Sequence, residues 1–525
     1  MDSLAFNLIH RFNVGDSLRR SAKRYPAKAA VRFEGADTSY AELDAKADKV
    51  ARFFLDRGIA TGDAVAFLGL NSLSFLAHFF GLARIGAPFV PINGLLRGKE
   101  VDYVLSRANV KALVIDPMLS GSLDLGSEAL SCIRHKFALG SGPAPEGFEL
   151  MEPMLQGVLD DPVECLVENE DPATILFTSG TTAFPKAVMN THLNYYASFL
   201  AAVTDIGITK EDRPLLCLPL FHSAGLFLAF SAITAGVTST MLSWIEPDGI
   251  FRAIEQDKVS VVALPATVWI ALSQIPDIGE KDLRSLKTLL VFQYLPTEVL
   301  KKWMALIPGA VWINYWGQTE MIPLGASTPP GILETKLSAP NPVGIPHLPL
   351  EIRVVDEQMN ELPPFGVGEM VARGPAITPG YLGDQEATEE LFMGGWHHTG
   401  DIGFKDEEGF LYFVDRKKDM IKSGGENVAS QEVEEVLSAH PKVAEVAVIG
   451  MADPYWVEKV VAVIKTKASE TLTQDEVVVF AKTRLASFKA PKEVYFVEDL
   501  PRSPSGKVLK RAMKDEIVRQ VKKEV

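Results

Sequence analysis

Short apolar segments alternate with helical segments in the first hundred residues of the chain. Strands are expected at residues 29–33, 64–68 and 89–93. Between them, Ser39 and Glu42 have the spacing of a capping box at a helix start, and residues 74–85 have the apolar character of a buried helix. Strands that alternate with helices favour a doubly wound α/β fold with parallel strands.

A loop rich in small hydroxylated residues follows another apolar segment. Residues 175–192 read ILFTSGTTAFPKAVMNTH, so a buried strand leads into five small residues and then into Pro185 and Lys186. Exposed backbone N–H groups and hydroxyls form a concavity that binds anions, and a lysine adds a point charge for phosphate oxygens. The loop lacks the Walker A spacing, because Pro185 stands where the second glycine would be.

This order of residues resembles the phosphate-binding signature of the adenylate-forming enzymes, which include acyl-CoA synthetases, firefly luciferase and the adenylation domains of peptide synthetases. Ala183 and Ala187 stand where the family has glycine. The segment from residue 62 to residue 93 is also similar to the family, and the acyl-CoA synthetase branch is the most similar. The resemblance implies that ATP or AMP is bound by Thr178, Ser179, Gly180, Thr181, Thr182 and Lys186.

Three further motifs match the family's nucleotide and metal ligands. NYWGQTEM at 314–321 matches its aromatic-Gly-x-Thr-Glu signature. There Trp316 is expected to stack on adenine, Thr319 to bond the α-phosphate or the acyl carboxylate, and Glu320 to hold Mg²⁺. By the same resemblance, Asp401 accepts hydrogen bonds from both ribose hydroxyls and Arg416 contacts the ribose.

The acyl pocket is expected between residues 222 and 295. In the family an aromatic residue or a histidine borders this pocket, and His222 occupies that place in CLPLFHSAGL. Phe292, Gln293 and Tyr294 replace the small residues of a GGAP-like turn, with Gln293 and Tyr294 beside the nucleotide. Bulky Phe292 predicts a pocket for a small, cyclic, aromatic or medium-chain acid rather than a long-chain one; repacking with an unchanged pocket is the alternative.

The C-terminal part carries the family's mobile elements. The resemblance implies a hinge at 416–418 with Lys418 at its centre, Gly424 and Gly425 near the coenzyme A tunnel, and Lys507 reaching the active site during adenylation. The predicted domains are 1–415, for AMP binding and adenylation, and 416–525. The predicted fold is α/β: a large N-terminal domain of doubly wound sheets with a small β-barrel subdomain, then a small mobile α+β domain. Residues 119–170 are expected to be surface connections.

Composition limits the other classes of function. The net charge of −15 argues against nucleic-acid binding, and three cysteines without a CxxC pair favour a reducing compartment. No signal peptide and no transmembrane segment is recognised, so a cytoplasmic location is expected. Peripheral membrane contact and a homodimer stay open.

The sequence therefore predicts an AMP-forming acyl-CoA ligase with ATP, Mg²⁺, coenzyme A and a small carboxylic acid as ligands. Two alternatives remain: a ligase with another acceptor, such as a carrier protein or oxygen, and a degenerate nucleotide-binding homologue. No carrier domain follows the C-terminal segment that contains Lys507, and this favours the CoA ligase. The direction is open, because the altered loop also allows ATP formation from acyl-CoA, AMP and pyrophosphate.

Overall fold

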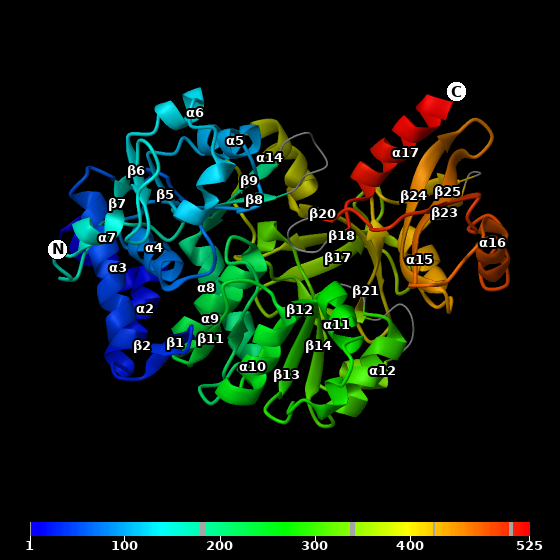
Figure 1. Ribbon diagram of the computed structural model, residues 1–525, viewed down its shortest axis with the longest axis horizontal. Coiled ribbons are helices and arrows are strands. Elements are labelled where there is room, and N and C mark those ends of the chain that lie inside the picture. Colours follow the sequence, from blue (N-terminus) through cyan, green and yellow to red (C-terminus); the bar gives the residue numbers. More distant parts are fainter. Residues whose placement is uncertain are drawn as a thin grey trace.

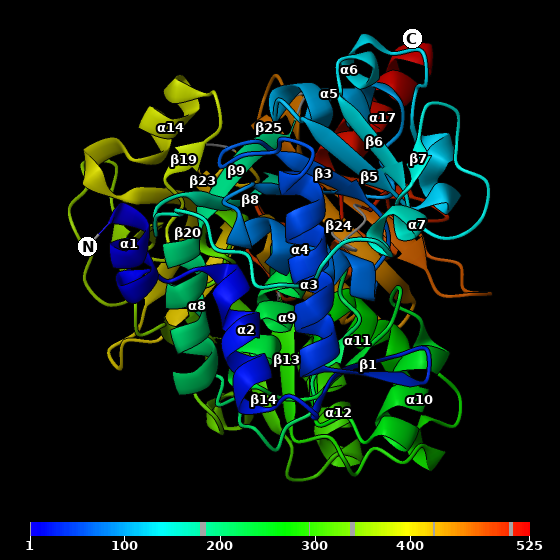
Figure 2. The same ribbon diagram turned by 90° about the vertical axis from the view of Figure 1, so that its left-hand side faces the viewer.

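The computed structural model describes residues 2–178, 185–292, 295–336, 342–423, 426–502 and 508–524. The chain forms a large body, coloured blue to yellow in Figure 1, and a smaller orange-to-red part beside it. In the larger body, helices lie against the faces of the sheets (Figures 1 and 2).

One sheet is built mainly from parallel strands of the N-terminal half. Its order is β19-β9-β8-β4-β3-β5-β6-β7, with β9 and β19 antiparallel at one edge. The strands are β3 (Val65–Leu68), β4 (Phe89–Ile92), β5 (Ala112–Ile115), β6 (His135–Ala138), β7 (Glu149–Leu150), β8 (Pro172–Thr178), β9 (Lys186–Thr191) and β19 (Gly380–Tyr381). All residues of β3, β4 and β5 are buried, as expected for a parallel sheet covered on both faces.

Both helices expected in this region are present, at Tyr40–Leu55 and Leu73–Arg84. Ser39 and Glu42 form the expected capping box at the start of α3. The helices are α1 (Ser3–His10), α2 (Val14–Arg24), α3 (Tyr40–Leu55), α4 (Leu73–Arg84), α5 (Lys99–Arg107), α6 (Glu128–Ser131), α7 (Met151–Leu155), α8 (His192–Thr204) and α9 (Ser223–Ala235). The prediction that residues 119–170 only connect other elements is wrong, because β6 and β7 extend the sheet there. The buried apolar part of β6 is only Phe137 and Ala138, which is too short to show the alternation of apolar and polar residues that marks a strand.

A smaller sheet has the order β10-β11-β1-β2. Its strands are β1 (Ala29–Phe33), β2 (Ala36–Ser39), β10 (Leu215–Leu216) and β11 (Ser239–Met241). Residues 29–33 therefore form the predicted strand, but it pairs with β11 and not with β3 or β4. Its partner lies two hundred residues away, and local sequence does not encode such a pairing.

A third sheet joins parallel strands to antiparallel ones, in the order β12-β13-β14-β15-β16-β21-β20-β18-β17. Its parallel strands are β12 (Val261–Pro265), β13 (Thr288–Phe292) and β14 (Val311–Trp316). The antiparallel strands, from the region predicted to be β-rich, are β15 (Ala326–Ser327), β16 (Pro342–Pro346), β17 (Glu351–Val355), β18 (Gly368–Arg373), β20 (His397–Lys405) and β21 (Leu411–Arg416). The helices of this region are α10 (Pro247–Asp257), α11 (Ala266–Ser273), α12 (Thr297–Leu306), α13 (Ile332–Thr335) and α14 (Gln385–Leu391).

The C-terminal part has its own sheet and apolar core. The sheet order is β23-β22-β25-β24, and β26 pairs with β25. Its elements are β22 (Ile421–Ser423), β23 (Glu426–Val428), α15 (Ser430–Ser438), β24 (Val443–Asp453), β25 (Val457–Thr466), α16 (Gln474–Lys482), β26 (Glu493–Phe496) and α17 (Lys510–Glu524). Buried Val433, Val448 and Ile464 belong to a core made only of residues that follow 420.

Within the described residues, no helix combines the length and the apolar character needed to cross a bilayer.

Candidate functional site

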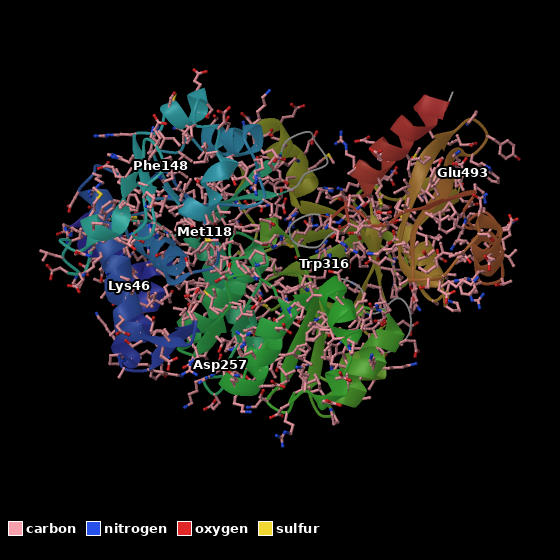
Figure 3. The ribbon with its side chains drawn as sticks, in the orientation of Figure 1. Lys46, Met118, Phe148, Asp257, Trp316 and Glu493 are labelled. Carbon is pink, nitrogen blue, oxygen red and sulfur yellow. The ribbon has the colours of Figure 1, made fainter. Side chains whose placement is uncertain are left out.

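The predicted site residues fall into two groups. The structure describes Thr178, Lys186, His222, Phe292, Trp316, Thr319, Glu320, Asp401, Arg416 and Lys418. Nine others lie outside the described residues: Ser179, Gly180, Thr181, Thr182, Gln293, Tyr294, Gly424, Gly425 and Lys507. Trp316 lies near the middle of the molecule, toward the C-terminal part (Figure 3).

Lys186 is connected to Glu320 through a tyrosine. Thr178 at the end of β8 pairs with Lys186 at the start of β9. The Lys186 ammonium lies 4.5 Å from the ring centroid of Tyr381, and the Tyr381 hydroxyl donates to Oε1 of Glu320 at 2.9 Å. Burial and the negative charge of Glu320 raise the pKa of Tyr381. Tyr381 therefore stays protonated and holds Glu320 beside the end of the phosphate loop.

Thr319 and His222 meet at the start of α9. Oγ of Ser223 lies 3.4 Å from Oγ1 of Thr319, which begins a short 3₁₀ helix, Thr319–Met321. His222 is the N-cap residue of α9, and its Nδ1 accepts a hydrogen bond from Ala224 N at 3.4 Å. The predicted acyl-side histidine and the predicted phosphate-side threonine are thus neighbours, although almost one hundred residues separate them in sequence.

Asp401 is a buried carboxylate surrounded by donors. Nε1 of Trp316 donates to Oδ2 of Asp401 at 2.8 Å, and Nε2 of Gln318 donates to the same oxygen at 3.0 Å. Nε of Arg416 lies 2.6 Å from Oδ1. Asp401 and Arg416 are cross-strand partners on β20 and β21, so the sheet register brings the predicted ribose ligands together.

Sequence reasoning assigned no role to two residues at this site, Gln318 and Tyr381. Gln318 is the variable position of the aromatic-Gly-x-Thr-Glu signature, and Tyr381 follows Gly380 in a segment outside the signatures named above. A polar side chain inside a nucleotide-binding signature was the available signal for Gln318. For Tyr381 no local signal exists, because its function depends on the pairing of β19 with β9.

The predicted acyl side is aromatic. Phe292 ends β13 and lies opposite Tyr315 on β14, with ring centroids 5.5 Å apart. Phe227 of α9 contacts the other side of Tyr315, with centroids 6.3 Å apart. Three aromatic side chains therefore lie together here, and Phe227 follows His222 by five positions in the chain.

Lys418 lies in the turn that leads from β21 to β22. Burial lowers its pKa, and the neighbouring positive charges of Arg416 and Arg511 act in the same direction. Close by, Asp415 accepts hydrogen bonds from the backbone N–H and the hydroxyl of Ser430, at 2.6 and 2.7 Å. These bonds connect the last strand of the third sheet to α15 across the predicted hinge.

The chain after residue 507 is anchored to α15. The Lys510 ammonium lies 2.7 Å from Oε1 of Glu434 and donates to Oγ of Ser430. Lys510 therefore ties the start of α17 to the same serine that Asp415 binds.

Glu320 suits a cation that is shared with a phosphate. Among the described residues, no cluster of three histidine, cysteine or carboxylate side chains could hold a metal. Oε1 of Glu320 is held by Tyr381, and the carboxylate stays partly accessible. Mg²⁺ commonly takes one or two carboxylates and completes its coordination with substrate phosphates and water, so the residues present fit that mode.

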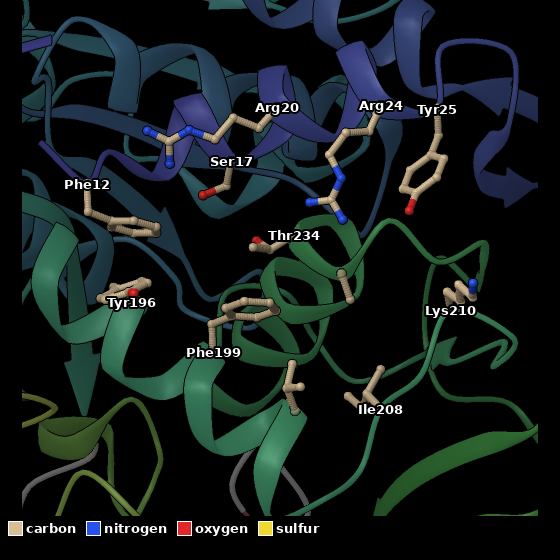
Figure 4. A pocket seen from close by; sticks show the side chains of 12 residues that line it. Phe12, Ser17, Arg20, Arg24, Tyr25, Tyr196, Phe199, Ile208, Lys210 and Thr234 are labelled. Carbon is tan, nitrogen blue, oxygen red and sulfur yellow. The ribbon is translucent and has the colours of Figure 1, made fainter. Parts of the chain in front are cut away.

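A separate hollow of about 440 Å³ opens between α2, α8 and α9 (Figure 4). Phe12, Tyr196 and Phe199 lie on one side of it, and Arg24 reaches toward it from α2. Thr234 and Ala235, which line it, lie at the opposite end of α9 from His222. For a helix of this length the two ends are separated by roughly 18 Å. The rings of Tyr195, Phe199 and Phe230 pack between the two ends of α9.

Comparisons with known proteins agree with this geometry. Residues 18–382 match the model of the AMP-binding enzyme family, and residues 432–507 match the model of the AMP-binding enzyme C-terminal domain. An indoleacetate–CoA ligase of Aromatoleum aromaticum is 33% identical over 95% of this chain and 97% of its own length. A feruloyl-CoA synthase of an Amycolatopsis species is also 33% identical, over 94% and 96% of the two chains.

The fold is shared with solved structures. An o-succinylbenzoate CoA synthetase from Bacillus subtilis, in complex with its acyl-adenylate intermediate, superposes with a TM-score of 0.83 at 26% identity, covering 95% of this chain and 98% of the other. The predicted fold class and the resemblance to the adenylate-forming enzymes are thereby confirmed. The family matches cover most of the chain, and the relatives extend over nearly all of it. The chain therefore belongs to the AMP-binding enzyme family and, within it, to the AMP-forming acyl-CoA ligases.

Proposed function

We propose that this enzyme activates a small, cyclic, aromatic or medium-chain carboxylic acid with ATP and then transfers the acyl group to coenzyme A. The observation that carries the proposal is the row Lys186, Tyr381, Glu320, Thr319 and Ser223. It extends from the end of the phosphate loop to the start of α9, where His222 and the aromatic acyl side lie. A carboxylic acid and a nucleoside triphosphate could meet along this row.

In the first half-reaction, an oxygen of the acid's carboxylate attacks the α-phosphorus of ATP. One O–P bond forms, the bond to pyrophosphate breaks, and the acyl group becomes joined to AMP. Lys186 binds the departing phosphates, Thr319 orients the α-phosphate or the carboxylate, and Asp401 with Arg416 holds the ribose. Mg²⁺ held by Glu320 would neutralise phosphate charge when bound.

Lys507 completes the charge stabilisation in this proposal. A lysine that reaches the acyl carboxylate and the α-phosphate lowers the energy of the charge that develops in the transition state. The domain boundary is placed at about residue 416, and the C-terminal domain turns about Lys418 after adenylation. The turn removes Lys507 and brings the coenzyme A thiol to the carbonyl carbon, from which AMP leaves. The bonds of Asp415 to Ser430 cross this boundary and would change during the turn.

The aromatic acyl side supports a compact acid. Phe292 and Phe227 both lie against Tyr315, and we expect these three rings to leave little room for a long acyl chain beside β13. Indoleacetate and ferulate, the acids in the names of two relatives, are aromatic acids of suitable size. A panel from acetate through benzoate, cyclohexanecarboxylate and indoleacetate to palmitate tests the size limit. Highest activity with palmitate would contradict it.

ATP–pyrophosphate exchange with the same panel tests the function itself. Exchange together with an acyl-CoA product is the expected result. Exchange without acyl-CoA would indicate another acceptor, such as a carrier protein, and no exchange with any acid would indicate a degenerate homologue. Supplying acyl-CoA, AMP and pyrophosphate to the same enzyme measures whether it also forms ATP.

A further inference from the structure

We propose that Tyr315 and His347 form a recognition site for a hydroxyl or N–H group that the acid carries at the end remote from its carboxylate. The inference rests on the proposed function, because it concerns the acid in the same site. Tyr315 is on β14, between Phe292 and Phe227, and is 3% exposed. His347 follows β16 and is 1% exposed, and the two ring centroids lie 5.4 Å apart.

Two neighbouring polar atoms at this place have no hydrogen-bond partner among the described residues: the Tyr315 hydroxyl and Nε2 of His347. A buried polar atom without a partner loses its bonds to water and gains none from the protein. Two such atoms on neighbouring buried rings are the arrangement that a polar group on a ligand would complete.

Asp205 fixes which hydrogen bonds His347 can form. Nδ1 of His347 lies 2.8 Å from Oδ2 of Asp205, and the backbone N–H of Leu348 donates to the same oxygen at 3.1 Å. Burial acts to raise the pKa of Asp205, but the hydrogen bonds from His347, Thr204 and Leu348 N outweigh it and lower the pKa. An ionised carboxylate only accepts, so Nδ1 carries the hydrogen. In a neutral imidazole with its hydrogen on Nδ1, Nε2 has a lone pair and accepts.

The chemistry of the ligand group follows from this pair. Burial raises the pKa of Tyr315 well above its ordinary value, so its hydroxyl remains a donor. With its ring neutral, His347 offers Nε2 as an acceptor. A hydroxyl on the ligand can accept from Tyr315 and donate to His347, and an N–H can donate to His347. A hydrogen or a methyl group at the same position does neither and would leave both protein atoms unpartnered.

The position of the pair distinguishes it from other buried polar atoms. Nε1 of Trp312, on the same strand, also has no partner among the described residues, but Trp312 packs against Trp269 and Trp303 on the opposite face. Tyr315 instead faces α9 and contacts Phe227, one turn after His222. Thr319, which is expected to bond the carboxylate of the acid, lies beside the start of the same helix, with its hydroxyl 3.4 Å from that of Ser223. In the proposed site the carboxylate end of the acid would be there and the remote end toward Tyr315.

Matched pairs of acids test the proposal. One acid of each pair carries the polar group and the other lacks it: 4-hydroxyphenylacetate with phenylacetate, 4-hydroxycinnamate with cinnamate, and indole-3-acetate with benzothiophene-3-acetate. In at least one pair, we expect kcat/KM for pyrophosphate exchange to favour the polar member by about tenfold or more, because a site built for a hydrogen bond rejects an analogue without it. Equal rates within all three pairs would overturn the proposal.

Variants assign the preference to the two residues. Tyr315→Phe should bring the hydroxyl-to-hydrogen ratio close to one, and His347→Leu should remove the preference for indole-3-acetate. Tyr40→Phe is the matched control, since Tyr40 is a buried tyrosine whose hydroxyl bonds Val237 O, away from the site; its ratio should equal that of the unaltered enzyme. A ratio that Tyr315→Phe leaves unchanged would refute the role of Tyr315.

Two further measurements keep the outcomes separate. Because Tyr315→Phe removes a hydroxyl without a partner, its Tm should not fall; a lower Tm together with equal loss for both members of a pair would indicate a structural role only. Equilibrium binding of the same acids, followed by calorimetry, gives the ratio without turnover. If no acid supports exchange but binding still prefers the polar members, the proposed function fails and the recognition site stands.

Discussion

Nε of Arg416 lies 2.6 Å from Oδ1 of Asp401, and the two residues are cross-strand partners on β20 and β21. Trp316 and Gln318 donate to the second oxygen of the same carboxylate. Four residues, as far as about 100 positions apart in sequence, therefore meet at one buried carboxylate. This cluster is the most completely described part of the proposed nucleotide site.

Replacing Asp401 with Asn should weaken ATP binding. The amide loses the charge that attracts Arg416, and hydrogen bonds to a charged group contribute about 1.5–3 kcal/mol, or roughly ten- to a hundredfold in affinity. We expect the KM for ATP in pyrophosphate exchange to rise by about that factor. Asp37→Asn is a matched control, because Asp37 also pairs with an arginine across two strands, at 2.7 Å from Arg32, but at an exposed place. A similar effect in both variants would contradict the role of Asp401.

Replacing Glu320 with Gln should change the requirement for Mg²⁺. A neutral amide oxygen is a weaker ligand than a carboxylate, so half-maximal exchange should need about tenfold more Mg²⁺, and the maximal rate should fall. A titration with Mg²⁺ at saturating ATP measures both effects. Glu298→Gln, which alters an exposed carboxylate paired with Lys301, serves as the control. An unchanged Mg²⁺ midpoint in Glu320→Gln would exclude Glu320 as a ligand.

Replacing Lys507 with Ala should separate the two half-reactions. Loss of a cation that stabilises the transition state should reduce acyl-AMP formation by about 10²–10³-fold. Thioester formation from supplied acyl-AMP and coenzyme A should change little, because the proposed domain turn removes Lys507 from the site before that step. The two rates are measured separately, with Lys514→Ala as a nearby control. Equal losses in both steps would reject the division of roles.

Removing the carboxylate of Asp48 should destabilise the N-terminal region. Asp48 lies 2.8 Å from the guanidinium of Arg19 and 2.6 Å from that of Arg84, and all three side chains are almost completely buried. Asp48→Ala leaves two buried cations without this partner, which should reduce the free energy of unfolding by about 3–5 kcal/mol. Urea denaturation measures the loss. Asp37→Ala, at an exposed pair, should cost no more than about 1 kcal/mol.

Buried histidines should make the stability depend on pH between 5 and 6.5. Burial lowers the pKa of His192 to about 3, and its Nδ1 accepts a hydrogen bond from Val14 N at 3.1 Å. The unfolded chain takes up a proton below its ordinary pKa of about 6.5, whereas the folded chain does not until about pH 3. The stabilising contribution is therefore complete above pH 6.5 and declines as the pH falls, by about 1.4 kcal/mol per pH unit.

Urea unfolding at pH 7, 6 and 5 measures this decline. His192→Asn retains an acceptor for Val14 N but does not titrate. The slope of the unfolding free energy against pH should therefore fall by what one proton contributes, about 1.4 kcal/mol per pH unit. His10→Asn, at an exposed position, should leave the slope unchanged. Equal slopes in His192→Asn and the unaltered protein would contradict the prediction.

Local patterns in the sequence determined the elements and the signatures. The capping box of Ser39 and Glu42, the buried strand before Thr178 and the Thr319-Glu320 pair each depend on residues within a few positions of one another. Hydrogen bonds within a helix turn and the alternation of faces along a strand are short-range, so composition and spacing are enough to predict them.

The tertiary structure decided which distant residues meet. Tyr381 reaches Glu320 only because β19 pairs with β9, and β1 joins β11, about two hundred residues away, rather than β3 or β4. His347 meets Asp205 across 142 positions, at the end of α8. Sheet register and helix packing set such contacts, and they depend on the summed burial of many side chains rather than on any single segment, which is why sequence reasoning identified the motifs but not the residues that hold them in place.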